Sequence, residues 1–275
     1  MIKFMPSRAG TKPEITLEGD RHMTHEEIKA TLFLNAVLAD IEPLVEIDER
    51  AAALVRGWNN TIQFQVENGG PAAYLQFSNG KPKLIAGRSG NPTILFSFDT
   101  IAQLIDMMDG KGKPKIKKGM IRIFTLLKFQ KLTQIMEKTL KPDASALKDP
   151  AALKRTLTLT MNTALNGIKI IAENDPHIEA TAAHLGTGTA QFSVLPDGPH
   201  GYVTVVDNKI TPAMGKLNDA TVYMEFRTPE IAMQVFNGEL DSMAAIGVCD
   251  IVLRGFYPLA GALSTIMGRI EHFLQ

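Results

Sequence analysis

The stretch TIQFQV at residues 61–66 returns 128 positions later as TAQFSV at residues 189–194. Around it the chain repeats without a gap, because residues 61–119 align with residues 189–247 and fourteen of these 59 positions are identical. Unrelated segments of average composition would share about three or four. A period this long indicates two copies of one domain rather than a solenoid of short repeats.

The repeated stretch has the alternating pattern of a strand that is buried on one side. Ile62, Phe64 and Val66 are apolar and the two residues between them are glutamines, which is the period of two that a half-buried strand shows. Three more strands, a short helix, a fifth strand and a closing helix follow in each copy, so the pattern predicts an α+β domain whose helices cover one face of its sheet. The expected strands lie near 61–66, 72–77, 82–86, 93–98 and Met120–Phe124 in the first copy, and near 189–195, 201–206, 209–214, 220–226 and 249–254 in the second.

The segment before the first strand predicts a helix that both copies cover. Thr24 and Glu27 form the pattern of a capping box, which starts a helix. Residues 30–41, ATLFLNAVLADI, are apolar on nearly every side of such a helix, and a helix of this kind has to be covered on more than one face. We therefore expect this segment to lie between the two copies.

A polar linker separates the copies. It spans residues 141–150, KPDASALKDP, and ends in Asp149 and Pro150, the pattern of a helix cap followed by a first-turn proline. The predicted domains are therefore residues 24–140 and 151–275, each long enough for a core of its own.

Composition excludes several classes of protein. The 29 basic and 29 acidic side chains give a net charge of zero, so no general electrostatic attraction to nucleic acid or to a membrane is expected. No apolar run approaches the ~18 residues of a membrane span, and the N-terminal segment lacks the apolar centre of a signal peptide. Cys249 is the single cysteine, so no internal disulfide can form. We expect a cytoplasmic protein.

Longer stretches in both copies are similar to one known family of domains. In the second copy they are QFSVLPDGPHGYVTVVDNKI (191–210) and VYMEFRTPEIAMQVFNGELDSMAAIGVCDIVLRG (222–255), and in the first YLQFSNGKPKL (74–84) and ILFSFDTIAQLIDMMDGK (94–111). They resemble the opening strands and the centre of the sterol carrier protein type 2 domain family. The first copy departs from the family after Gly110, where KGKPKIKKG replaces a smaller, apolar segment.

The resemblance implies both a fold and a function. The fold is a five-stranded mixed sheet in each copy, with an apolar tunnel between the sheet and the helices. The function is the binding and carriage of hydrophobic lipids such as fatty acids, acyl-coenzyme A esters or sterols, with no catalytic residue, cofactor or metal of the domain's own. The chain is therefore expected to be a non-enzymatic lipid-binding protein.

The methionines add to this expectation. The chain has 13 of them, and several fall in matching regions of the two copies. A flexible thioether side chain fills gaps in a core, but it also adapts to ligands of irregular shape. The family resemblance favours the second role around the helix that follows the fourth strand. The predicted tunnel residues are Phe98, Leu104, Met107, Met108, Leu132, Met136, Phe226, Met233, Phe236, Met243, Leu259, Leu263 and Met267.

Five lysines form the main charge cluster, in the segment where the first copy departs from the family. On a solvated loop they would only keep the segment in water. Beside an anionic membrane surface or a coenzyme A phosphate, each lysine would contribute about 1 kcal/mol before screening. Both interpretations stay open for Lys111, Lys113, Lys115, Lys117 and Lys118.

Two other functions are open on the sequence alone. A scaffold or partner-binding protein without a lipid ligand is the first, because bulky aromatic residues would fill a tunnel in the first copy. An enzyme is the second, and it is less favoured because no convergent set of nucleophile, base and metal ligands is evident. The aromatic residues in question are Phe96, Phe98, Phe124 and Phe129.

Overall fold

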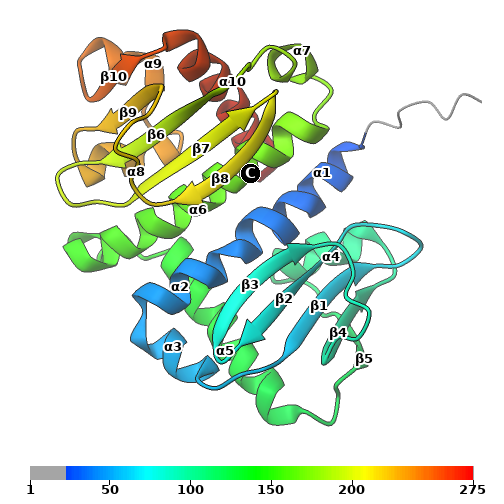
Figure 1. The fold of residues 1–275 in the computed structure, drawn as a ribbon. Helices are drawn as coiled ribbons and strands as arrows, with labels where there is room; N and C mark the ends of the chain where they lie inside the picture. The colour runs from blue at the N-terminus through cyan, green and yellow to red at the C-terminus, as the bar shows by residue number, and fades with distance from the viewer. Residues whose placement is uncertain (1–22, 275) are drawn as a thin grey trace, which may run out of the picture.

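Each copy of the repeat forms one five-stranded sheet, and the two sheets have the same strand order (Figure 1). The computed structural model describes residues 23–274. The first sheet runs β3-β2-β1-β4-β5 and the second β8-β7-β6-β9-β10, so the strands correspond one to one. They are β1 (Thr61–Val66), β2 (Ala72–Ser78), β3 (Lys81–Ala86), β4 (Ile94–Phe98), β5 (Lys115–Lys118), β6 (Gly188–Val194), β7 (His200–Val206), β8 (Lys209–Met214), β9 (Val222–Phe226) and β10 (Ile251–Gly255).

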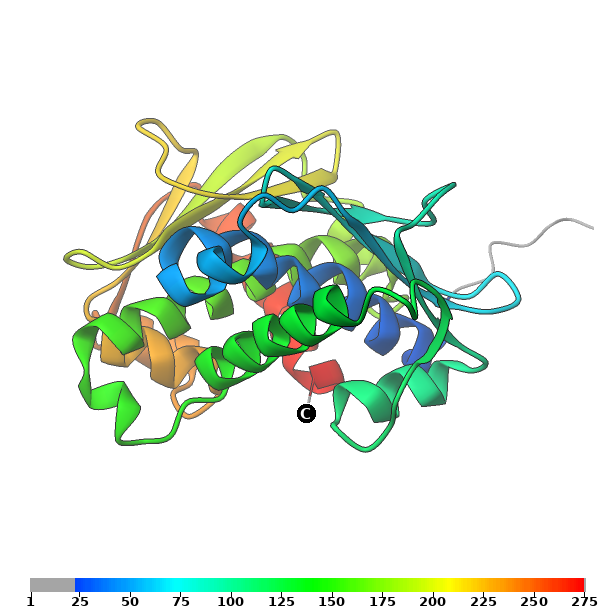
Figure 2. The same ribbon diagram turned by 90° about the horizontal axis from the view of Figure 1, so that it is seen from below.

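The helices cover one face of each sheet, so both sheets lie toward one side of the molecule and the helices toward the other (Figure 2). The first repeat carries α1 (His25–Leu32), a π-helical turn (Phe33–Val37), a 3-10 turn (Leu38–Asp40), α2 (Ile41–Ile47), α3 (Glu49–Val55), α4 (Ile101–Met108) and α5 (Ile123–Leu140). After a 3-10 turn at Ala146–Lys148, the second carries α6 (Pro150–Asn174), α7 (Glu179–Ala182), α8 (Pro229–Phe236), α9 (Ser242–Gly247) and α10 (Tyr257–Leu274).

Strand register confirms the duplication residue by residue. The central strand of each sheet is antiparallel to the strand after it and parallel to the fourth strand, so both sheets are mixed. In the parallel pairs Ile62 lies opposite Ile94 and Ala190 opposite Val222. Both partners shift by the same 128 positions between the copies. The predicted α+β class with two five-stranded mixed sheets is therefore confirmed.

The repeated glutamine of the central strand is buried rather than facing solvent. Gln63 is 2% exposed and Gln191 1%. The side-chain oxygen of Gln63 accepts a hydrogen bond from the backbone of Ser89 at 2.7 Å, and that of Gln191 accepts one from Leu217 at 2.6 Å. In each repeat this bond ties the loop after the third strand to the sheet. A buried amide of this kind has to be hydrogen-bonded, which gives the recurring glutamine a structural reason.

The first helical segment lies between the two repeats, as its apolar pattern predicts (Figure 1). One face, with Ile28 and Leu32, packs into the core of the second repeat. The opposite face, with Ala30 and Leu34, packs into the core of the first. In the opposite direction, Leu159 of α6 in the second repeat packs into the core of the first. Each core is thus completed by a helix of the other repeat.

A buried polar contact joins the same helices. Asp40 is fully buried, and its carboxylate accepts hydrogen bonds from Asn162 Nδ2 at 2.8 Å and Thr163 Oγ1 at 2.5 Å. Burial raises the pKa of the Asp40 carboxyl well above its usual value, against the opposing effect of the two hydrogen bonds. The contact fixes the helix of one repeat against that of the other.

Helix starts follow the capping patterns of the sequence. Thr24 caps α1 in a capping box with Glu27, and Asp149 caps α6 with Pro150 in its first turn. At α4 the cap is Thr100, whose hydroxyl accepts a hydrogen bond from the backbone of Gln103.

The fifth strand of the first repeat differs from the prediction. It is Lys115–Lys118, and the expected strand at Met120–Phe124 is wrong. Gly119 ends β5 with a φ of +87°, and a Cβ there would lie 2.7 Å from the carbonyl oxygen of Thr93. The left-handed conformation that glycine permits turns the chain off the sheet. The apolar residues beyond it therefore form a turn and the start of α5.

Candidate functional site

An aromatic cluster fills the space between sheet and helices in the first repeat. The ring centroids of Phe64 and Phe96 are 5.0 Å apart, and Phe129 lies 6.0 Å from Phe64 and 6.2 Å from Phe96. All three side chains are buried. They bring together two strands and the closing helix α5, and they leave the layer dense and rigid.

In the second repeat two of the three rings of this cluster are replaced, and only Phe192 keeps the place of Phe64. Met224 stands where the first repeat has Phe96. The closing helices α5 and α10 have 18 residues each, and the four buried positions of α5 have the same spacing as the last four of α10, which aligns Leu263 with Phe129. The unbranched side chain of methionine changes rotamer at little cost, and leucine is smaller than phenylalanine, whereas packed rings do not adapt in this way. The second repeat is therefore the one whose interior can adapt.

Half-buried side chains border this adaptable layer. Phe236 of α8 packs on Phe226 with ring centroids 5.4 Å apart. Phe236, Leu240 and Met267 are each only partly buried against the core. They place an apolar rim between the interior of the second repeat and solvent.

The structure places most of the predicted tunnel residues in these two layers. One of them, Met243 on α9, is 71% exposed and does not line an interior space. Buried in the first repeat are Phe98, Leu104, Leu132 and Met136, with Met107 and Met108 half-buried beside them; buried in the second are Phe226, Met233, Leu259 and Leu263, with Phe236 and Met267 half-buried.

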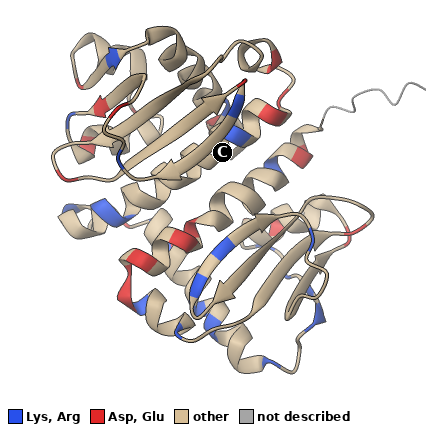
Figure 3. Cartoon of the chain, viewed as in Figure 1, with Lys and Arg blue, Asp and Glu red and all other residues tan. Residues whose placement is uncertain are grey.

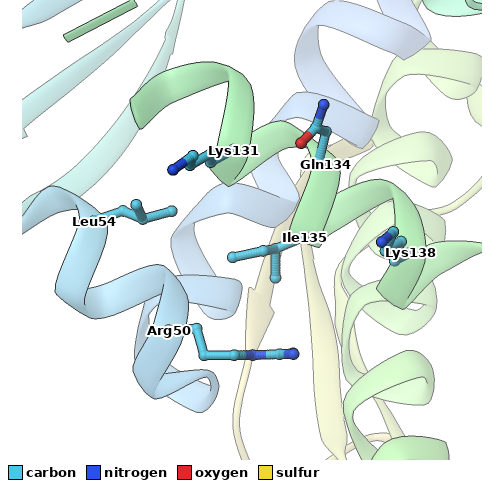
Figure 4. A pocket seen from close by; sticks show the side chains of 6 residues that line it. All are labelled: Arg50, Leu54, Lys131, Gln134, Ile135 and Lys138. Carbon is cyan, nitrogen blue, oxygen red and sulfur yellow. The ribbon is translucent and has the colours of Figure 1, made fainter. Parts of the chain in front are cut away.

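Two cavities open elsewhere on the molecule. One, of about 330 Å³, lies between α3 and α5 and is lined by Arg50, Leu54, Lys131, Gln134, Ile135 and Lys138 (Figure 4). The other, of about 570 Å³, is a groove between the repeats with Asn35, Asn166 and Glu173 among its lining residues. Neither is lined by a predicted tunnel residue. The tunnel stays a prediction, and it requires the packed side chains to move apart.

Three lysines of the cluster, Lys115, Lys117 and Lys118, lie on the edge strand β5, and Lys111 and Lys113 lie in the loop before it. Acidic residues lie beside the strand. Lys117 Nζ lies 2.7 Å from the Glu67 carboxylate, and Lys115 pairs with Asp99. Hydrogen bonds from Lys117, then Ser97 and Gln65, lower the pKa of Glu67 to about 2. Lysines on an exposed edge strand also discourage pairing with the strand of another chain.

A group of exposed apolar side chains follows this strand, and the sequence analysis missed it. Ile121 is 94% exposed and Phe124 84%. The sequence analysis placed residues 120–124 in a strand, and the scaffold alternative placed Phe124 in a filled interior, which its exposure contradicts. The glycine before them was the signal that the strand ends earlier. We call this group the apolar corner, and it consists of Met120, Ile121, Ile123, Phe124 and Leu127.

Comparisons with known proteins return sterol carrier folds among solved structures. The sterol carrier protein domain 2 of Helicoverpa armigera is 18% identical, with a TM-score of 0.32, and the match covers 42% of this chain and 91% of that one. Sterol carrier protein 2 of Yarrowia lipolytica, in its apo form, is 14% identical, with a TM-score of 0.31 and coverages of 40% and 91%.

A different protein also matches in part. The stereoselective inverting sec-alkylsulfatase Pisa1 of Pseudomonas sp. is 14% identical, with a TM-score of 0.26, over 51% of this chain and 27% of that one. No protein-family model and no curated protein matches the sequence. The function of this chain has to be inferred from its own residues.

Residues 23–274 contain neither a membrane-spanning helix nor a metal-binding cluster. No helix in this range is both long and apolar enough to cross a membrane. Nor do three or more His, Cys, Asp or Glu residues of this range gather as a group that could hold a metal ion.

Proposed function

We propose that this chain binds and carries a hydrophobic lipid, such as a long-chain fatty acid, an acyl-coenzyme A ester or a sterol, without catalysing a reaction on it. The observation that supports this is the adaptable layer of the second repeat. Met224 and Leu263 replace an aromatic stack there, and the rim above them is apolar and only half-buried. An acyl chain that parts these side chains would be enclosed between sheet and helices.

Burial of the ligand supplies the affinity in this proposal. Each methylene removed from water contributes about 0.8 kcal/mol, so a long acyl chain supplies on the order of 10 kcal/mol gross. Ordering the ligand, desolvating its polar end and moving the protein side chains consume part of that. The first repeat would not bind in the same way, because its stacked rings already occupy the equivalent space.

An acidic substitution at equivalent positions of the two repeats tests which repeat binds the lipid. Phe236→Asp is expected to weaken saturable binding of a long-chain fatty acid to delipidated protein by at least about tenfold, because it places a carboxylate in an apolar wall. Met233→Asp should act in the same direction. The matched control is Met108→Asp, since Met108 holds the equivalent half-buried place in α4 of the first repeat. It should leave the affinity unchanged.

Circular dichroism has to accompany these titrations, because a charge near a core also destabilises. The informative comparison is between variants that keep the native spectrum. If folded native protein binds no long-chain lipid saturably, the carrier proposal is wrong. Equal losses in the two variants would contradict the assignment to the second repeat.

A scaffold that binds a partner protein is the second candidate. The observation that favours it is the dense packing of the predicted tunnel residues, together with helices that lock the repeats into one unit. In that case the native protein would retain no lipid through purification, which native mass spectrometry detects directly.

Contact with an anionic membrane belongs to the carrier proposal, because a carrier has to collect and release its lipid at a surface. The five lysines predicted for this role do not all contribute equally. Lys115 and Lys117 are held by Asp99 and Glu67, and Lys111 Nζ lies 3.7 Å from the Asp109 carboxylate. The other cations near β5 therefore have to supply most of the attraction.

A further inference from the structure

The apolar corner is a cluster and not a set of scattered side chains. Its five members fall within eight consecutive positions, in the turn after β5 and the first turns of α5. Single exposed hydrophobic residues are ordinary on a protein surface. A contiguous group with side chains as exposed as Ile121 and Phe124 marks a surface that contacts something else.

Cations surround this corner. Arg122 lies inside it, Lys128 and Lys131 follow on exposed positions of α5, and Lys118 precedes it on β5, with Lys113 farther away before the start of that strand. Figure 3 shows the basic residues at this end of the first repeat. Within residues 23–274 no carboxylate lies at ion-pair distance from any of these five side chains, and Lys118 instead donates to the uncharged Asn91 at 2.5 Å. The corner therefore combines an apolar tip with an excess of positive charge.

The exposed apolar side chains and the excess of positive charge together indicate what the corner binds. A second copy of the chain would bring two positive corners together, and like charges at an interface are unfavourable. The corner is also a projection rather than a groove, since Ile121 and Phe124 are almost fully exposed. A lipid bilayer accepts projecting apolar side chains at the boundary of headgroups and acyl chains, and anionic headgroups attract the cations beside them.

We infer that the first repeat docks on anionic membranes by inserting its apolar corner, with the flanking lysines and arginine at headgroup level. Ile121 and Phe124 enter the acyl boundary. This inference rests on the membrane contact in the proposed function and names the residues that make it. Docking needs no ligand in the second repeat, so it can be tested separately from fatty-acid binding.

The second repeat offers a natural contrast. Phe256 and Tyr257 are also exposed at the start of its closing helix. The nearby cation Arg254 is paired with Glu225 at 2.8 Å, which leaves no comparable excess of charge. We expect only the corner of the first repeat to dock.

Vesicle flotation with the full chain and no added fatty acid tests this directly. Wild-type protein should float with vesicles of phosphatidylcholine and phosphatidylserine at low ionic strength, and much less with phosphatidylcholine alone. The double variant Ile121→Ser, Phe124→Ser should bind the anionic vesicles at least about tenfold more weakly, because it removes the inserting surface. Both sites are exposed, so the melting temperature should not fall. The matched control, Phe256→Ser with Tyr257→Ser, should bind like wild type.

A second measurement distinguishes insertion from charge attraction alone. Trp58, the only tryptophan, is buried in the first core. A Phe124→Trp variant should gain a fluorescence component that lipids brominated on their acyl chains quench, while the Trp58 signal of wild type stays unquenched. Lys128→Gln with Lys131→Gln should reduce the preference for anionic over neutral vesicles.

Three results would overturn the inference. The first is a failure of the wild-type protein to bind anionic vesicles at low salt. The second is undiminished binding of the Ile121→Ser, Phe124→Ser variant. The third is a wild-type dimer in sedimentation velocity that this variant converts to monomer, which would make the corner an interface between copies. A failure here leaves fatty-acid binding by the second repeat untouched, so the two proposals fail separately.

Discussion

Leu32→Ala is expected to lower the free energy of unfolding by about 2–5 kcal/mol and to loosen the second repeat, although Leu32 belongs to the first by sequence. The side chain is fully buried, and its neighbours are core residues of the second repeat. Removing a buried leucine leaves a cavity whose cost adds to the lost transfer free energy. Hydrogen exchange should show faster exchange in α6 and α10 than in α5.

Leu34→Ala is the matched control, because it makes the same chemical change two residues away on the opposite face of the helix. Leu34 is 1% exposed and belongs to the core of the first repeat. This variant should lose a similar free energy of unfolding, but exchange should accelerate in β1 and α5. If both variants loosen the same repeat, the helix is not shared between the two cores.

The second large effect concerns Asp40. Asp40→Ala should lower the free energy of unfolding by about 1–3 kcal/mol, because Asn162 and Thr163 lose the acceptor of their buried hydrogen bonds. Asp40→Asn keeps an oxygen in place and should be tolerated. Chemical denaturation near neutral pH measures both.

The pH dependence of these variants tests the state of the carboxyl group. A folded pKa above the unfolded value means that the folded state holds its proton more tightly. The stability that Asp40 contributes is then fully present below its unfolded pKa, about 3.9, and is lost as pH rises through the raised folded value. Relative to Asp40→Asn, wild-type protein should become steadily less stable over that range. A constant difference between the two would show that Asp40 is ionised throughout.

Most of the fold could be predicted because the duplication carries information that one copy lacks. Matching Thr61–Val66 with Thr189–Val194 identified the central strands, and the second, third and fourth strands of each repeat followed at the same spacing. The all-round apolar pattern of residues 30–41 indicated a shared helix. The burial of Gln63 could not be foreseen, since it depends on a loop that folds over the second face of the sheet.

The fifth strand shows why apolar pattern alone misleads. Met120–Phe124 is more hydrophobic than Lys115–Lys118, yet the lysine-rich segment pairs with β4. Gly119 decides this through its backbone conformation, which leaves no room for a side chain beside Thr93. The candidate site could also be predicted only in part. Sequence spacing identified which residues face the core, but not whether Phe96 and Phe129 would meet and close it.

The sharing of helices between the repeats has a consequence for how such a pair can change over time. Each core includes side chains from a helix of the other repeat. Loss of either repeat would therefore expose apolar core residues of the remaining one, so we expect the two repeats to be retained together. Because the two repeats are retained together, they need not both have the same function. The first repeat can keep an aromatic interior and the apolar corner with its cations, while the second repeat keeps the adaptable layer. Asymmetry between the copies is then an outcome of their physical inseparability.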